Sequence, residues 1–140
     1  MNIYSNNAKE TTNLAKKISK KVKWGVIVLE GELGAGKTTF VRSFIQSFGI
    51  RTKVKSPTFN IIKKYEIPKH FGTIYHIDCY RLKDYKEAIP LGIKGIFKTP
   101  KSFILVEWAE RIKKIIPKKH IKIHIDHVDK NTRKINIVGI

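Results

Sequence analysis

The sequence predicts an α/β fold in which helices flank a mainly parallel β-sheet and the chain ends in an antiparallel hairpin. Three observations support this prediction. Short apolar runs at 24–29 and 103–106 have the length of buried strands. Segments with apolar side chains at helical spacing lie between the apolar runs. Residues 121–137 alternate apolar and polar side chains around a polar turn, as the two strands of a hairpin do.

Length and composition suit one folded domain over residues 1–140. The chain is long enough for one core and too short for two ordinary domains. A hydrophobic content of 41% excludes a disordered chain. No apolar run approaches the ~20 residues of a membrane helix, and the N-terminus lacks the basic and apolar parts of a signal peptide. The single cysteine, Cys79, excludes an internal disulfide and a cysteine-based zinc site. We therefore expect a cytoplasmic protein without membrane contact.

The chain is strongly basic. Lys and Arg number 29 against 11 Asp and Glu, which gives a formal charge of +18. Lysine supplies 24 of these positive charges, whereas surfaces that bind nucleic acid tend to use arginine. The charge therefore has two interpretations. It is either a solvated basic surface that follows from biased composition, or a basic face that meets RNA or an acidic partner.

The first part of the chain predicts a helix, a strand, a turn and a second helix, in that order. Residues 8–20 have the apolar spacing of a short amphipathic helix. Residues 24–29 form a strand that leads into a glycine-rich turn at 31–36. From Thr38 onward, apolar side chains recur at helical spacing as far as Gly49, a typical C-terminal cap.

The rest of the chain predicts alternating strands and helices. A proline at position 57 places 56–58 in a loop. Strands are expected at 59–67, 74–78 and 103–106, helices at 82–91 and 109–116, and the hairpin strands at 121–125 and 135–137. Because no repeat or linker interrupts this order, the whole chain is interpreted as one α/β domain.

Residues 31–38, GELGAGKT, fit the phosphate-loop pattern G-x-x-x-x-G-K-[ST]. Glycines let backbone N–H groups approach phosphate oxygens, and the following helix directs its positive end to the same place. Lys37 would bring its charge to the β and γ phosphates, and Thr38 would bring a hydroxyl to Mg²⁺. A strand leads into the loop and a helix leads out, which is the arrangement of a P-loop NTPase domain. The expected nucleotide-binding residues of the loop are Glu32, Leu33, Gly34, Ala35, Gly36, Lys37, Thr38 and Thr39.

The sequence also indicates which nucleotide binds and which residues could ligate its metal ion. The Asn/Thr-Lys-x-Asp tetrad that reads guanine is absent from the sequence, which favours ATP. Mg²⁺ on the phosphates needs a nearby carboxylate. Asp78 and Glu107 both fit, because each stands at the carboxyl end of an expected strand. Thr58 is either a switch residue that contacts the γ-phosphate or part of a Ser-Pro-Thr turn. His76 and Trp108 are interpreted as packing residues or as side chains that orient their neighbours.

Four segments together resemble the bacterial TsaE (YjeE) family: GELGAGKTTF at 31–40, SPTF at 56–59, HIDCYRL at 76–82 and VEW at 106–108. Their order and spacing match as well, and the resemblance spans nearly the whole chain. It implies a small P-loop ATPase in the synthesis of threonylcarbamoyladenosine (t6A), a modification next to the anticodon of ANN-decoding tRNAs. It also implies TsaD and TsaB type partners, with ATP hydrolysis supporting turnover of the modifying complex.

The resemblance also implies roles for single residues. Thr38 and Glu107 would ligate Mg²⁺, and Asp78 would act close to the nucleotide and the metal. Thr11 and Arg133 occupy positions that contact the adenine side. Contact with tRNA would be indirect or through the basic surface. The expected catalytic residues are Lys37, Thr58, Asp78 and Glu107, and the expected cofactors are ATP and Mg²⁺.

Two other functions fit parts of the pattern. A P-loop small-molecule kinase shares the loop but usually carries it near the N-terminus and adds an arginine-rich lid. This chain has a helix before the loop and only five arginines. A non-catalytic basic RNA-binding module would keep a vestigial loop, whereas Lys37, Thr38 and both candidate acids are present here.

Overall fold

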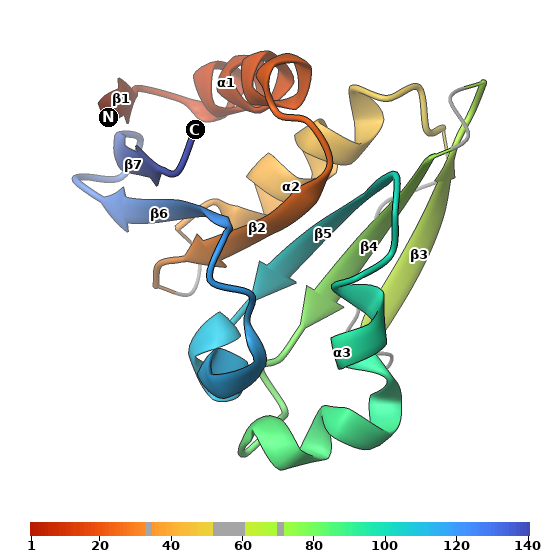
Figure 1. Ribbon diagram of the computed structural model, residues 1–140. Helices are drawn as coiled ribbons and strands as arrows, with labels where there is room; N and C mark the ends of the chain where they lie inside the picture. The colour runs from red at the N-terminus through yellow and green to blue at the C-terminus, as the bar shows by residue number, and fades with distance from the viewer. Residues whose placement is uncertain (33–34, 52–60, 70–71) are drawn as a thin grey trace.

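The computed structural model describes residues 1–32, 35–51, 61–69 and 72–140 (Figure 1). These residues build one seven-stranded sheet with the order β1-β7-β6-β2-β5-β4-β3. Its strands are β1 (Asn2–Ser5), β2 (Gly25–Glu30), β3 (Ile62–Ile67), β4 (Gly72–Asp78), β5 (Ser102–Glu107), β6 (Ile121–His127) and β7 (Arg133–Val138). The helices are α1 (Ala8–Lys21), α2 (Lys37–Gln46) and α3 (Ile93–Ile96), with the 3₁₀ helices η1 (Tyr85–Glu87), η2 (Ile89–Leu91) and η3 (Ala109–Ile115).

The centre of the sheet is parallel and its edges are antiparallel. Strand β2 pairs in parallel with β5 and with β6, and β5 pairs in parallel with β4. The antiparallel pairs are β3 with β4 at one edge, and β6 with β7 and β7 with β1 at the other. The expected α/β fold and the C-terminal hairpin are thus confirmed, and the parallel part is limited to four strands.

Both faces of the sheet are covered, which explains why its central strands read as continuous apolar runs. Helices α1 and α2 cover one face, and α3 lies with η1 and η2 on the other (Figure 1). Ile27 and Leu29 of β2 pack with the first layer, whereas Val26 and Val28 pack with the second. Alternate side chains of a strand point to opposite faces, so one apolar run supplies two cores.

Two helices expected from the sequence form as 3₁₀ helices and not as continuous α-helices. In place of an α-helix at 82–91, the chain forms η1 and η2 before α3 begins. Pro90 lacks the N–H that an α-helix needs, and Gly92 adopts a φ of +79° that ends the segment. In place of an α-helix at 109–116, the chain forms η3, which is interrupted at Ile112 by a φ of −125°.

The sequence analysis also missed β1 and the pairing of β3 with β4. Strand β1 has only four residues and pairs with β7 alone, so its alternation is too short to recognise. The strand expected at 59–67 begins at Ile62 within the described residues, and 59–60 lie outside them. No helix of the described chain is long and apolar enough to span a bilayer.

Candidate functional site

The candidate site lies where three parallel strands end. Leu29 of β2 and Asp78 of β4 are both register partners of Glu107 on β5. The carboxyl ends of β2, β5 and β4 therefore meet at one edge of the sheet, as Figure 1 shows. Ligands of open α/β sheets bind at this edge. The fold thus brings both candidate acids to the strand that leads into the phosphate loop.

Two glycines shape the loop between β2 and α2. Gly31 has a φ of +137°, and a Cβ at this position would overlap the carbonyl oxygen of Ile125 on β6. Gly36 has a φ of +105° and caps α2 without any side-chain hydrogen bond. The first N–H groups of α2 therefore face the loop, where an anion can accept their hydrogen bonds. Leu33 and Gly34 lie outside the described residues.

Lys37, the first residue of α2, is held inside the loop. Its side chain is buried, and Nζ donates a hydrogen bond of 2.8 Å to the carbonyl oxygen of Gly31. The same Nζ lies 4.4 Å from the centroid of the Trp108 ring, a cation–π contact. Thr38 is exposed at the start of α2, and Thr39 is half-buried.

The loop and its surroundings enclose a hollow of about 490 Å³. Its walls come from the ends of β2 and β6, the loop, and the segment after β5. They are formed by Leu29, Glu30, Gly31, Glu32, Lys37, Trp108, Glu110, His124 and Asp126. The hollow is therefore lined by one buried lysine and by several carboxylates, and we call Glu30, Glu32, Glu110 and Asp126 with His124 its rim.

The buried acid Glu107 forms a hydrogen-bonded pair with a buried histidine. The Oε2 atom of Glu107 lies 2.6 Å from Nε2 of His76, and the two side chains are 5% and 1% exposed. Nδ1 of His76 has no hydrogen-bond partner among the described residues. This contact lets His76 orient the Glu107 carboxylate, and its burial fits packing as well, so the structure agrees with both parts of the sequence interpretation.

Asp78 is half-buried beside this pair. Its Oδ1 accepts a hydrogen bond of 3.0 Å from the backbone N–H of Tyr80. Burial raises the pKa of Asp78, although this hydrogen bond and the nearby Lys37 oppose the rise. A carboxylate in this setting binds a proton more readily than one in water.

The two residues expected on the adenine side have different surroundings. Nε of Arg133 donates a hydrogen bond of 3.1 Å to the carbonyl oxygen of Ala35 in the loop. The same side chain donates from Nη1 to the carbonyl oxygen of Asp129, at 3.1 Å, in the β6–β7 turn. Thr11 is buried, and its hydroxyl lies 2.7 Å from the hydroxyl of Ser5. Arg133 therefore supports the loop, whereas Thr11 joins α1 to β1.

A second histidine, which sequence reasoning missed, lies on the rim. Nδ1 of His124 lies 3.3 Å from Glu30, and Nε2 lies 2.8 Å from Asp126. Burial lowers the pKa of His124, but the two carboxylates outweigh this effect and raise it. The sequence offers one signal for this cluster: His124 and Asp126 are two residues apart at the end of an expected strand and therefore lie on the same face. That spacing does not show that Glu30 lies beside them.

Comparisons with known proteins identify the family. The family model "Threonylcarbamoyl adenosine biosynthesis protein TsaE" matches residues 5–135. The chain belongs to the TsaE family. A TsaE protein of Rickettsia bellii is 40% identical over 136 residues, which cover 96% of this chain and 92% of the relative. A TsaE protein of Bacillus subtilis is 38% identical over 138 residues, which cover 96% of this chain and 82% of the relative.

A solved structure agrees with these matches. The crystal structure of Bacillus subtilis YdiB superposes with a TM-score of 0.80 at 34% sequence identity, and the match covers 98% of this chain and 83% of that one. The resemblance and the fold class inferred from sequence are thereby confirmed. Membership of the TsaE family supports a role in t6A biosynthesis and in nucleotide binding.

In this TsaE chain most of the expected site residues lie close to the phosphate loop, and some others are not among the residues that the structure describes. Lys37, Thr38, Asp78 and Glu107 stand at one edge of the sheet. Thr58 and the rest of the segment 56–59 fall outside the described residues, so its expected switch role stays a prediction.

Proposed function

We propose that this TsaE chain is a cytoplasmic, single-domain ATPase. It binds ATP with Mg²⁺ and hydrolyses the nucleotide in support of t6A modification, together with TsaD and TsaB type partners. One observation carries the proposal. The buried Lys37, the open N-terminus of α2 and the acids Asp78 and Glu107 converge at one edge of the sheet.

The loop binds the triphosphate. Backbone N–H groups of the loop would donate hydrogen bonds to the phosphate oxygens. These groups belong to Glu32, Leu33, Gly34, Ala35, Gly36, Lys37, Thr38 and Thr39. Lys37 exchanges its contacts with Gly31 and Trp108 for the β and γ phosphates. Arg133 and Thr11 would contact the adenine side, and Arg133 also supports the loop through its hydrogen bond to Ala35.

The donor set fits Mg²⁺. This ion prefers oxygen ligands and is usually held by one or two carboxylates together with phosphates. The described residues contain no cluster of three or more His, Cys, Asp or Glu side chains that could hold a metal alone. Thr38 and Glu107 would hold the ion, with Asp78 as the alternative carboxylate. The carboxylate of Glu107 uses one oxygen toward His76 and retains acceptor capacity. When bound, Mg²⁺ neutralises charge on the phosphates.

The remaining steps use the side chains of the chain itself. Water attacks the γ-phosphorus, and the bond to the β–γ bridging oxygen breaks to release ADP and phosphate. Lys37 stabilises the negative charge that develops on the phosphate oxygens. Asp78, with its raised pKa, orients the water and accepts its proton. Thr58 would contact the γ-phosphate only in the triphosphate state and so make the affinity for the partner proteins depend on the bound nucleotide.

The test is ATP hydrolysis by the purified chain and by Lys37→Ala. Hydrolysis by the wild type, measured as released phosphate, should depend on Mg²⁺ and should be lost in the variant. Circular dichroism controls for folding, since the substitution removes a charge and little core volume. Hydrolysis by Lys37→Ala at the wild-type rate would overturn the proposal. Transfer of the γ-phosphate to an added nucleoside or small acid, instead of to water, would favour a small-molecule kinase.

Partner proteins should accelerate the reaction. Of the arginines, Arg133 is bonded to Ala35 and Arg111 donates to the carbonyl oxygen of Leu82, so neither is positioned as a finger on the γ-phosphate. A supplied arginine finger typically raises phosphoryl-transfer rates by about 10³ or more. We expect slow hydrolysis alone and faster hydrolysis with the purified TsaD–TsaB type complex. A fast rate that the complex leaves unchanged would contradict this arrangement.

A further inference from the structure

Acidic side chains gather at the carboxyl ends of the parallel strands, around the hollow of the candidate nucleotide site. The carboxyl edge, which holds the nucleotide site, also carries Glu30, Glu32, Glu110 and Asp126 on the rim of its hollow. At the opposite edge a second hollow, of about 380 Å³, lies where β2 and β6 begin. We call it the amino-edge groove. It is lined by residues 21–26, 119–121 and 139–140 and contains no acidic side chain.

Lysines surround the amino-edge groove. Lys21 and Lys23 reach it from the end of α1, and Lys119 reaches it from the segment before β6, next to His120. All three lysines are exposed. A neighbouring hollow of about 400 Å³ shares Lys21 and Ile140 with the groove and continues along α1. Figure 1 shows both chain ends near α1, where this continuation lies.

Trp24 is one of the residues that line the amino-edge groove. Trp24 is 43% exposed even though its ring centroid lies 4.9 Å from that of Phe103. Gly72 has no Cβ, and a Cβ there would meet the Trp24 ring at 2.6 Å. The ring is thus fixed by packing against β4 and β5, while the residue keeps exposed surface. Tyr4, 58% exposed, lines the neighbouring hollow.

We propose that the amino-edge groove binds a single-stranded RNA segment, with phosphates along the three lysines and a base stacked on Trp24. Proteins that bind single strands combine such a basic groove with aromatic platforms. This proposal rests on the proposed function in one respect: the TsaE family supports the modification of tRNA, so tRNA is the RNA that the groove would meet. Lysines suit contact with the backbone, which positions RNA without reading its bases.

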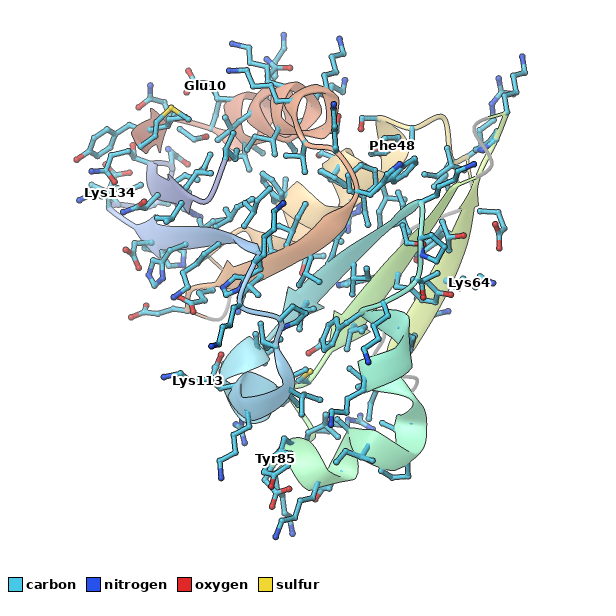
Figure 2. The ribbon with its side chains drawn as sticks, in the orientation of Figure 1. Glu10, Phe48, Lys64, Tyr85, Lys113 and Lys134 are labelled. Carbon is cyan, nitrogen blue, oxygen red and sulfur yellow. The ribbon has the colours of Figure 1, made fainter. Side chains whose placement is uncertain are left out.

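The acids around the nucleotide-site hollow explain why RNA would bind in the amino-edge groove and not beside the nucleotide. The acidic rim repels phosphates that lack a metal ion, whereas the amino-edge groove has no such acids. Elsewhere some lysines are paired, as Lys64 is with Glu66 and Lys122 with Glu30. Figure 2 shows Lys64, Lys113 and Lys134 on widely separated elements, so a test must separate the groove from general positive charge.

The first test measures the affinity for RNA by fluorescence anisotropy, using a labelled 12-nucleotide uridine RNA and an unmodified tRNA transcript. The groove variant Lys21→Glu/Lys23→Glu/Lys119→Glu is compared with Lys83→Glu/Lys86→Glu/Lys94→Glu, which changes the net charge equally at exposed sites around η1, η2 and α3. We expect binding at least tenfold weaker in the groove variant and within about threefold of wild type in the control. Losing three phosphate contacts should also reduce the salt slope by about 2.

A second variant tests the aromatic platform. Trp24→Leu keeps apolar packing against Phe103 but removes the stacking surface. It should weaken RNA binding by roughly tenfold while leaving the salt slope unchanged. Trp24→Phe, which retains a ring, should lose less. Thermal unfolding of each variant checks that the fold is intact, and a loss of RNA binding with a wild-type melting temperature supports the proposal.

Several outcomes would overturn the inference. These are equal losses in both triple variants, the absence of RNA binding by the wild type at low salt, or an RNA affinity that Trp24→Leu leaves unchanged. If the groove variant loses only its binding to purified protein partners in the absence of RNA, the groove is a protein surface. ATP binding is measured on every variant and should stay unchanged. Loss of RNA binding alone therefore tests the groove, whereas a wild type that does not bind ATP contradicts the proposed function.

Discussion

Two histidine–carboxylate clusters flank the candidate nucleotide site, and they differ mainly in burial. His76 and Glu107 are 2.6 Å apart and almost completely buried between β4 and β5. His124 lies between Glu30 and Asp126 on the rim, at 3.3 and 2.8 Å, with 40% of its side chain exposed. Water screens the rim cluster, so each of its ion pairs contributes little free energy. The buried pair has no such screening, so each member depends on the other.

The comparison indicates a division of tasks. The buried pair fixes the direction of a carboxylate at the end of β5, the one proposed above as a ligand of Mg²⁺. The rim cluster joins the end of β2, just before the loop, to β6. The first arrangement is closed to solvent, whereas the second contains a partly exposed histidine whose pKa its two carboxylates raise.

The largest expected effect is on the buried pair. His76→Ala leaves the Glu107 carboxylate buried without its partner, and we expect the free energy of unfolding to fall by about 3–5 kcal/mol. Urea denaturation measures this loss. The double variant His76→Leu/Glu107→Met removes both polar groups and should recover most of the stability. A single variant as stable as the wild type would show that the pair contributes no more than the rim.

The second-largest expected effect is a loss of ATP hydrolysis on substitution of Asp78, which the rim acids should not share. Asp78→Asn retains an oxygen for the Tyr80 N–H but cannot accept a proton from water. ATP hydrolysis should fall by about 10²-fold or more, with little change in nucleotide affinity. Asp126→Asn, on the rim, is the matched control and should hydrolyse ATP at close to the wild-type rate. If both variants lose the same fraction of their ATP hydrolysis rate, Asp78 has no role in hydrolysis that Asp126 lacks.

A smaller effect concerns the metal. Glu107→Gln keeps a hydrogen-bond acceptor for His76 but removes the negative charge. ATP affinity in Mg²⁺ should fall by about tenfold, or about 1.4 kcal/mol, while affinity in EDTA changes little. Isothermal titration in the two buffers measures the difference, with Glu110→Gln as the control. Equal shifts with and without Mg²⁺ would make Asp78 the first candidate ligand.

The smallest effect is the pH dependence of the rim. The folded-state pKa of His124 is raised. Its contribution is therefore fully present below the unfolded pKa of about 6.5 and is lost as pH rises through the folded-state pKa. We expect His124→Gln to be less stable than wild type by under about 1 kcal/mol at pH 5.5. At pH 9 the urea midpoints should coincide. A difference that is the same at both pH values would assign His124 a packing role.

Sequence reasoning succeeded where the relevant signal is local. The loop from Gly31 to Lys37 lies between an apolar strand and a periodic helix, and the structure has both of them as β2 and α2. Asp78 and Glu107 were recognised because strand ends can be read along the chain. Their adjacency follows from the parallel pairing of β4 with β5.

Sequence reasoning failed where distant residues decide the structure. His76 and Glu107 are separated by 31 residues, and Glu30 and His124 by 94. Such pairs depend on strand order, which apolar periodicity does not encode. The turns of η1 and η2 follow from Pro90 and Gly92, whose effect was outweighed in the prediction by the apolar spacing around them.

The contacts of Lys37 have a consequence for how tightly the proposed site would hold a nucleotide. The Gly31 carbonyl oxygen and the Trp108 ring both contact the Lys37 ammonium, so they compete with phosphates for it. Each 1.4 kcal/mol of that internal interaction weakens nucleotide binding tenfold. The phosphates must replace both contacts when they bind. A site built in this way would hold its nucleotide less tightly than one whose lysine has no other partner.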